Sequence, residues 1–376
     1  MAAVEAKAVS LPVPSVQQLA KENPAVVPSR YIRQDIKSPA PEKPPCSPTD
    51  VPVIDMQKLV SEEFSGEESP ELQKLHCACK DWGFFQLINH GVRSSVVEKA
   101  KREVQEFFNL PLEEKENKYG IAEGEKEGFG QHFIVSQEQK LDWADMFYIK
   151  TLPTHIRSPK LFPKLPQPFR DTIEEYSVEV HKVAMKVLNL LAKKLGIKAE
   201  EMRMLFEEGM QSMRMNYYPP CPHPELVMGL SPHSDPGGLT ILLQANETKG
   251  LEIKKYGVWI PIVPIPNAFI VNVGDSVEIF TNGIYRSIEH RGVVSPDKER
   301  VSIATFHSPK MNAELGPATS LITPQTPANF KRINVADFYR LFFKCKLDGK
   351  SRIERLRIAN DYGGFVLKNS VYIARS

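Results

Sequence analysis

The apolar positions of this 376-residue chain follow two different periods, one in each half. In the first half they recur every three or four residues, most regularly over residues 171–195, just before Gly196. This spacing predicts a long amphipathic helix with a glycine stop. Similar spacing predicts one helix that begins at Ser69-Pro70 and another that begins at Ser94 or Ser95 and ends before Pro111.

After residue 210 the apolar runs become short, and Pro, Gly, Asn and Asp separate them. We expect strands at residues 213–218, 239–243, 251–253, 258–262, 269–273, 277–280 and 301–306. Two further runs, at 51–54 and 84–88, predict strands in the first half. Short strands at regular spacing with turn signals between them are typical of an antiparallel sandwich or barrel.

These patterns divide the chain into four parts. Residues 1–52 form a Pro-rich extended arm, with a short helix at 16–20 and a surface linker at 39–52. Residues 53–210 form a mainly helical region packed on the core, and residues 211–358 form the β-rich core itself. Within the core, 351–358 predicts a helix, and residues 359–376 are a tail. The expected fold class is therefore α+β with a mostly β core.

The composition of the chain limits the classes of partner that it is expected to bind. The 48 Lys and Arg against 46 Asp and Glu give a net charge of +2, which favours neither a nucleic-acid nor a membrane-surface partner. No apolar run reaches the roughly 20 residues that span a bilayer, and residues 1–14 lack a signal-peptide pattern. The five cysteines are scattered, as in a cytosolic protein with reduced thiols. We expect a cytoplasmic monomer that acts on a small molecule.

Three residues of the β-rich part suggest a metal site. His233 and Asp235 are two apart in an extended segment, so their side chains share a face. His290 follows in the same β-rich part. Two histidines and one carboxylate form the facial triad of non-haem Fe(II) oxygenases, which leaves coordination positions open. A zinc hydrolase uses the same types of ligand, so the pattern alone keeps both interpretations.

Arg300 and Ser302 lie on one face of an expected strand, together with Ala304 and Phe306. A guanidinium beside a hydroxyl on a partly apolar face suits a ligand carboxylate, which it binds through two parallel hydrogen bonds. The strand pattern alone supports equally well an edge strand whose arginine is solvated.

A second strand carries a similar polar face. Arg214, Asn216 and Tyr218 alternate with apolar residues, so all three point the same way. They could line a cavity. The solvent face of an edge strand, ended by Pro219-Pro220, is slightly favoured by this strand alone.

Taken together, the motifs resemble those of the plant 2-oxoglutarate- and Fe(II)-dependent dioxygenases over about residues 13–358. The detail is most similar to the senescence-related, codeine O-demethylase-like branch. The residues that carry the resemblance are His233-Ser-Asp235, His290, Arg300-Val-Ser302, Asn216-Tyr-Tyr218-Pro-Pro, Asp81-Trp-Gly-Phe-Phe-Gln-Leu-Ile-Asn-His-Gly91, Glu127-Gly-Phe-Gly130, Leu141-Asp-Trp-Ala-Asp145, Gly238-Leu-Thr-Ile-Leu-Leu-Gln244 and Asn272-Val-Gly-Asp275.

The resemblance implies a double-stranded β-helix, or jelly roll, with packed N-terminal helices. It implies that Fe(II) binds to His233, Asp235 and His290. It also implies that Arg300 and Ser302 hold the distal carboxylate of 2-oxoglutarate, with Tyr218 and Asn216 assisting. By position, the family places substrate-pocket residues at Met146, Tyr148, Arg214, Phe306 and Ser308.

The activity that the resemblance implies is oxidation of a small hydrophobic, aromatic or polycyclic plant specialised metabolite by hydroxylation or O-demethylation. O2 and 2-oxoglutarate would be consumed, succinate and CO2 released, and ascorbate is a candidate reductant. The alternatives are desaturation or a non-oxidative reaction on the same scaffold, and a non-catalytic ligand-binding protein.

Overall fold

A computed structural model describes residues 11–22, 26–34, 51–62, 69–132, 134, 136–343, 347 and 349–358. Most of the predicted linker at 39–52 and the whole predicted tail at 359–376 lie outside these residues. Among the described helices, none is both long and apolar enough to cross a membrane.

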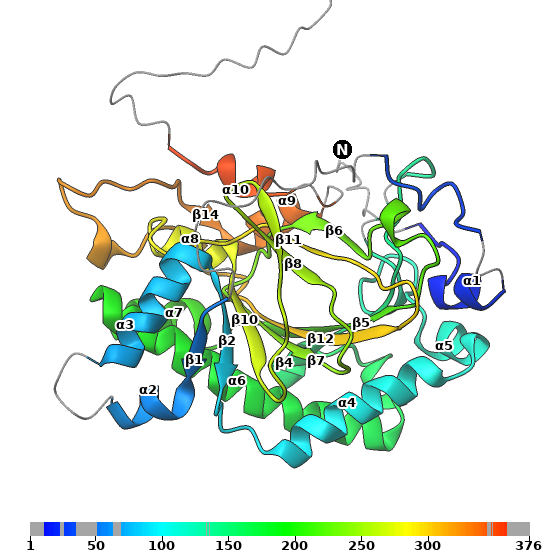
Figure 1. The fold of residues 1–376 in the computed structure, drawn as a ribbon. Helices are drawn as coiled ribbons and strands as arrows, with labels where there is room; N and C mark the ends of the chain where they lie inside the picture. Colours follow the sequence, from blue (N-terminus) through cyan, green and yellow to red (C-terminus); the bar gives the residue numbers. More distant parts are fainter. Residues whose placement is uncertain are drawn as a thin grey trace, which may run out of the picture.

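Two sheets face each other and form the centre of the molecule (Figure 1). The larger sheet has the order β1-β2-β10-β7-β12-β5-β4-β3, and the smaller has the order β6-β11-β8-β9. Apolar side chains of both sheets, among them Phe84, Leu242, Ile253 and Ala304, pack between them. This is the expected double-stranded β-helix. The strand bounds are β1 Val53–Asp55, β2 Phe84–Ile88, β3 Gly128–Gly130, β4 Asp145–Leu152, β5 Gln211–Tyr218, β6 Leu230–His233, β7 Leu239–Gln244, β8 Leu251–Lys255, β9 Val258–Pro261, β10 Phe269–Val273, β11 His290–Gly292, β12 Arg300–His307, β13 Glu314–Leu315 and β14 Ile333–Asn334.

The longest helix, α6, runs beneath the larger sheet beside α4, whereas α8, α9 and α10 lie near the top of the view (Figure 1). Helix α6 begins at Gln167, four residues before the predicted start, and ends as predicted at Gly196, which has φ +67°. Ser69 caps α3 as predicted, since its side chain accepts a hydrogen bond from the Leu72 amide. The α-helix bounds are α1 Val16–Glu22, α2 Met56–Glu62, α3 Pro70–Cys77, α4 Ser94–Asn109, α5 Leu112–Tyr119, α6 Gln167–Leu195, α7 Ala199–Phe206, α8 Asp275–Phe280, α9 Val335–Phe343 and α10 Ser351–Glu354.

One predicted strand is wrong. Residues 277–280 belong to helix α8, whose six residues are all buried. Asp275 and Glu278 in the first turn favour a helix N-terminus, and the amides of Gly274 and Asp275 bond to the carbonyls of Gly238 and Asp235. A short apolar run buried on every side has no period that separates strand from helix. The predicted helix at 351–358 is shorter than expected, and α9 and β4 were not expected at all.

The N-terminal residues are fixed to the core at Asp145, the first residue of β4. Its carboxylate accepts hydrogen bonds from the Ser15 hydroxyl and from the amides of Val16 and Gln17, at 2.5, 2.9 and 2.9 Å. A carboxylate at a helix N-terminus stabilises the helix, so α1 docks beside β5. The boundary between residues 210 and 211 stays a prediction; β1 to β4 precede it and share the larger sheet with later strands.

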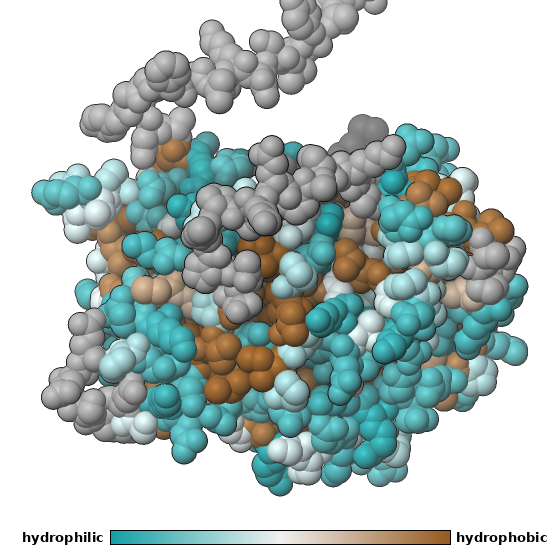
Figure 2. Space-filling view, viewed as in Figure 1, coloured by the Kyte–Doolittle hydropathy of each residue, from teal (hydrophilic) through white to brown (hydrophobic). Residues whose placement is uncertain are grey.

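Hydrophilic side chains cover most of the face shown in Figure 2, with an apolar area near its centre. Most large apolar side chains of the described residues are instead in the core, such as Phe107, Phe147 and Phe269. The interior of the jelly roll is different, because buried polar side chains line it.

Candidate functional site

His233, Asp235 and His290 meet at one end of the smaller sheet. Strands β6 and β11 pair antiparallel, with His233 directly opposite His290. Asp235 Oδ1 lies 3.5 Å from His233 Nε2 and 3.8 Å from His290 Nε2. One ligand atom of each residue lies within 4.8 Å of the others, and all three residues are buried. Among the described residues, this is the group of histidine, cysteine and acidic side chains close enough to hold one metal ion.

Hydrogen bonds orient each of the three side chains. His233 Nδ1 lies 2.8 Å from the Ser231 carbonyl and His290 Nδ1 lies 3.0 Å from the Ile288 carbonyl. Because a carbonyl only accepts, each Nδ1 carries the proton and each Nε2 presents a lone pair to the centre. The sequence determines this locally, since each histidine bonds the carbonyl two residues before it.

The second oxygen of Asp235 is occupied by the larger sheet. Thr240 Oγ1 donates to Asp235 Oδ2 at 2.6 Å, and Asn272 Nδ2 donates to the same oxygen at 2.8 Å. Oδ1 is left facing the two imidazoles. Neighbours of this kind raise metal affinity by holding the ligand in place.

The protonation states also suit a metal. Burial and the neighbouring His290 ring lower the pKa of His233 to about 3, so its imidazole is neutral. Burial alone would raise the pKa of Asp235, but the rings of His290 and His233 and the hydrogen bonds from Thr240 and Asn272 hold it below its usual value. Metal ligands must be unprotonated, and two imidazoles with one carboxylate match the donor set of a non-haem Fe(II) site.

A cavity of about 60 Å³ between the sheets, which we call the sheet cavity, lies next to this centre. Arg300, Ser302, Asn216 and Tyr218 line it together with the three candidate ligands. In the larger sheet β12 lies between β7 and β5, and β5 lies between β12 and β4. Both edge-strand interpretations are therefore wrong, and the polar faces of these strands point inward.

The sheet cavity has the features of a carboxylate-binding site. Arg300 is only 3% exposed, and its guanidinium lies 5.0 Å from the centre of the Tyr218 ring. Among the described residues, Ser302 Oγ and Asn216 Oδ1 are buried without a hydrogen-bond partner. Buried polar groups are rarely left unpaired, so a cation beside an unpaired hydroxyl fits the distal carboxylate of 2-oxoglutarate.

A second cavity of about 60 Å³, the inner cavity, is also lined by His233 and Asp235. Four of the five predicted substrate positions line it, namely Tyr148, Arg214, Phe306 and Ser308. Sequence reasoning missed Tyr339, Phe342 and Leu347, which come from the C-terminal part and line it as well. The Tyr339 hydroxyl donates to Ser308 Oγ at 2.6 Å.

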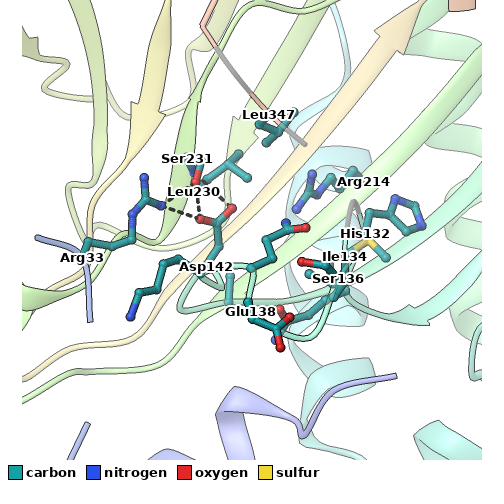
Figure 3. Close-up of a pocket in the computed structure, with 15 residues that line it drawn as sticks. Arg33, His132, Ile134, Ser136, Glu138, Asp142, Arg214, Leu230, Ser231 and Leu347 are labelled. Carbon is teal, nitrogen blue, oxygen red and sulfur yellow. Dashed lines mark hydrogen bonds and ion pairs between the residues drawn. The ribbon is translucent and has the colours of Figure 1, made fainter. Parts of the chain in front are cut away.

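The fifth predicted position, Met146, lines a larger cavity of about 460 Å³, the outer cavity (Figure 3). Arg214, His132 and Leu347 line both the inner and the outer cavity, so the two are neighbours. Figure 3 shows Arg33, Asp142 and Ser231 on one side and Arg214 and His132 on the other. Asp142 accepts hydrogen bonds from the Ser231 amide and hydroxyl, at 3.1 and 2.6 Å, and Arg33 lies 3.7 Å from it.

The residues that were missed differ in how visible they are in the sequence. Thr240 and Asn272 lie within motifs quoted for the family resemblance, and β7 and β10 were expected strands, so their inward faces could have been assigned by alternation. Tyr339 and Leu347 give no such signal, because α9 was not predicted and Leu347 lies beyond it.

Comparisons with known proteins agree with this geometry. Residues 209–309 match the family model of the 2OG-Fe(II) oxygenase superfamily, and residues 51–165 match that of the non-haem dioxygenase in morphine synthesis N-terminal region. The first match contains the three candidate ligands together with Arg300 and Ser302.

Similarity extends along nearly the whole chain. Oxoglutarate-dependent flavonoid 7-O-demethylase 1 of Ocimum basilicum is 53% identical over 358 residues, which cover 95% of this chain and 94% of that protein. Codeine O-demethylase of Papaver somniferum is 53% identical over 352 residues, covering 93% and 97%. The crystal structure of JOX2 in complex with 2OG, Fe and JA has a TM-score of 0.80 at 35% identity and covers 93% of this chain and 98% of its own. The chain therefore belongs to the 2OG-Fe(II) oxygenase superfamily, as a jelly-roll oxidoreductase whose cofactors are Fe(II) and 2-oxoglutarate.

Proposed function

We propose that His233, Asp235 and His290 hold Fe(II), and that Arg300 and Ser302 bind the distal carboxylate of 2-oxoglutarate with Tyr218 and Asn216 beside them. The observation that carries this proposal is that the candidate metal ligands and the candidate carboxylate-binding residues line one cavity. Three candidate metal-binding atoms converge within 4.8 Å, and the unpaired Ser302 hydroxyl lines the same cavity as a buried arginine.

When bound, Fe(II) and 2-oxoglutarate supply the family's chemistry, in which O2 is consumed, succinate and CO2 are released and a substrate C–H bond is oxidised. The chain's own residues position the reactants and exclude water. Thr240 and Asn272 hold Asp235 so that one oxygen stays available. The buried Arg300 fixes the cosubstrate in the sheet cavity and does not line the inner cavity, which is left for the substrate.

For the substrate, we propose a small, largely apolar plant specialised metabolite with an aromatic or polycyclic skeleton. The inner cavity is lined mainly by apolar and aromatic side chains, including Tyr148, Phe306 and Phe342. Met146 and Arg214 extend the contact surface toward the outer cavity. The similar flavonoid and codeine demethylases support O-demethylation, which follows when the hydroxylated carbon is an O-methyl group and formaldehyde leaves. We further propose that the protein acts as a cytoplasmic monomer.

The test is succinate formation by the Fe(II)-loaded protein with 2-oxoglutarate and O2 across a panel of methoxylated aromatic and polycyclic plant metabolites. Mass spectrometry of each candidate should find a product that has lost a methyl group or gained oxygen, together with succinate. The Asp235→Ala variant is the control. Equal succinate from both proteins with every compound would contradict the proposal.

A further inference from the structure

The C-terminal part of the described chain forms one wall of the inner cavity. Tyr339 and Phe342 of α9 line this cavity, and so does Leu347, which also lines the outer cavity. The position of this wall therefore affects the volume and shape available to a substrate. This wall follows the strands of the jelly roll in sequence and belongs to neither sheet, so contacts outside the two sheets hold it in place.

One such contact joins the wall to the strand that carries His233. Strand β6 is at the edge of the smaller sheet, and Gly349 forms a parallel bridge with His233. The Gly349 amide donates to the Pro232 carbonyl at 3.1 Å, and the Ser234 amide donates to the Gly349 carbonyl at 3.3 Å. These bonds flank His233 on both sides. Gly349 has φ +48°, which disfavours other residues there.

A buried carboxylate anchors the residues that follow Gly349. Glu278 of α8 is 0% exposed, and its two oxygens lie 2.7 Å from Lys350 Nζ and 2.8 Å from Arg357 Nη2. Glu278 also accepts a hydrogen bond from the Ser287 amide at 2.8 Å. The two cations are partly exposed, at 24% and 34% for Lys350 and Arg357.

Glu278 is not one of the three candidate metal ligands, nor does it line any of the three cavities. A buried ion pair adds little net stability, because desolvation offsets the attraction. What this arrangement does provide is one defined position for residues 349–357 against α8. The cations on either side of Glu278 come from both ends of that segment.

We propose that Glu278 is a positioning residue for substrate binding. Its carboxylate holds residues 349–357 in place and thereby fixes the position of Leu347 in the wall of the inner cavity. The proposal rests on the proposed function only in treating the inner cavity as the substrate site. Without the ion pairs of Glu278, this wall adopts several positions, and the affinity for the substrate falls. Tyr339, Phe342 and Leu347 do not line the sheet cavity, so 2-oxoglutarate binding is unaffected.

The experiment compares Glu278→Gln, the double variant Lys350→Met/Arg357→Met, and Gly349→Ala, which strains the segment at a residue with φ +48° but keeps both ion pairs of Glu278. Lys118→Met is the matched control, since it removes the Lys118–Glu114 ion pair at 2.7 Å on α5, outside this segment. Hydrogen–deuterium exchange is read on peptides that cover residues 349–358, with the metal site filled by Mn(II). KM is measured separately for the substrate and for 2-oxoglutarate.

In each of the three variants, the amide hydrogens of residues 349–358 should exchange on the order of tenfold faster than in the wild type. The substrate KM should rise on the order of tenfold, whereas the 2-oxoglutarate KM should stay within about twofold of its wild-type value. Glu278→Asp, which keeps the charge, should restore part of both. Unchanged exchange in 349–358, or an equal rise in both KM values, would overturn the proposal. The exchange arm needs no turnover, so its result stands even where the proposed function fails.

Discussion

The sheet cavity and the outer cavity are built in opposite ways. Four polar residues of the sheet cavity come from two paired strands, in which Arg300 lies opposite Tyr218 and Ser302 lies opposite Asn216. The outer cavity takes polar residues from segments that are far apart in sequence and not paired with one another in a sheet, such as Arg33, Asp142 and Ser231. The register of a sheet fixes the first set with the backbone hydrogen bonds that form the fold. Side-chain contacts between separate segments position the second set.

The difference suggests which half of the chemistry tolerates change. A substitution in the sheet cavity changes a site whose neighbouring residues cannot move without breaking the backbone hydrogen bonds between paired strands. A new residue in the outer cavity alters a wall whose contacts are individually weak. We therefore expect substitutions on the sheet side to abolish or strongly impair turnover with every substrate. Substitutions in the outer cavity should change which substrate is used.

The largest effect should follow loss of a metal ligand. Asp235→Ala removes the carboxylate shared by the two imidazoles, so Fe(II) binding and substrate-dependent succinate formation should both fall below detection. Circular dichroism should show an unchanged fold, because Thr240 and Asn272 remain paired in the larger sheet. Iron content after dialysis and succinate by mass spectrometry are the measurements. Wild-type iron content in this variant would show that Asp235 is no ligand.

The next largest effect should be on the cosubstrate. Arg300→Ala removes a charge-assisted pair worth about 3 kcal/mol, and so should raise the 2-oxoglutarate KM by about two orders of magnitude. The substrate KM should change little, because Arg300 lines the sheet cavity and not the inner one. Arg300→Lys keeps the charge but not the two parallel hydrogen bonds, and should fall between the two proteins. A 2-oxoglutarate KM equal to that of the wild type would contradict the assignment.

A smaller effect should follow at the support of the metal site. Thr240→Val keeps the size of the side chain and removes the 2.6 Å hydrogen bond to Asp235. Since such neighbours typically contribute about 10- to 100-fold to metal affinity, we expect Fe(II) to bind at least about tenfold more weakly. Titration with Fe(II) under anaerobic conditions measures this directly. Thr305→Val, a buried threonine on the other face of β12, is the control.

How far the sequence predicts the molecule follows the same division. Period 2 placed Arg300 with Ser302 on one strand face and Asn216 with Tyr218 on another, and the candidate metal ligands followed from two residues at strand spacing and one distant histidine. What alternation along one strand could not decide was whether that strand is at an edge, since that depends on long-range pairing. Residues such as Leu347 were missed for another reason: only tertiary contacts bring them to the site.

The smallest effect should come from the inner cavity, whose C-terminal wall is also held by side-chain contacts between separate segments, and it would extend the comparison to a third cavity. Tyr339→Phe removes one hydroxyl, which donates to Ser308 at 2.6 Å in the inner cavity. Losing one neutral hydrogen bond costs about 1 kcal/mol, so the substrate KM should rise about fivefold. The 2-oxoglutarate KM and the Fe(II) affinity should stay at their wild-type values, because Tyr339 does not line the sheet cavity. A matched Ser308→Ala variant should give a similar rise, and the double variant should add little, since both remove the same bond. If Tyr339→Phe instead weakened 2-oxoglutarate binding as much as substrate binding, the two sides would be coupled and the contrast between them would fail.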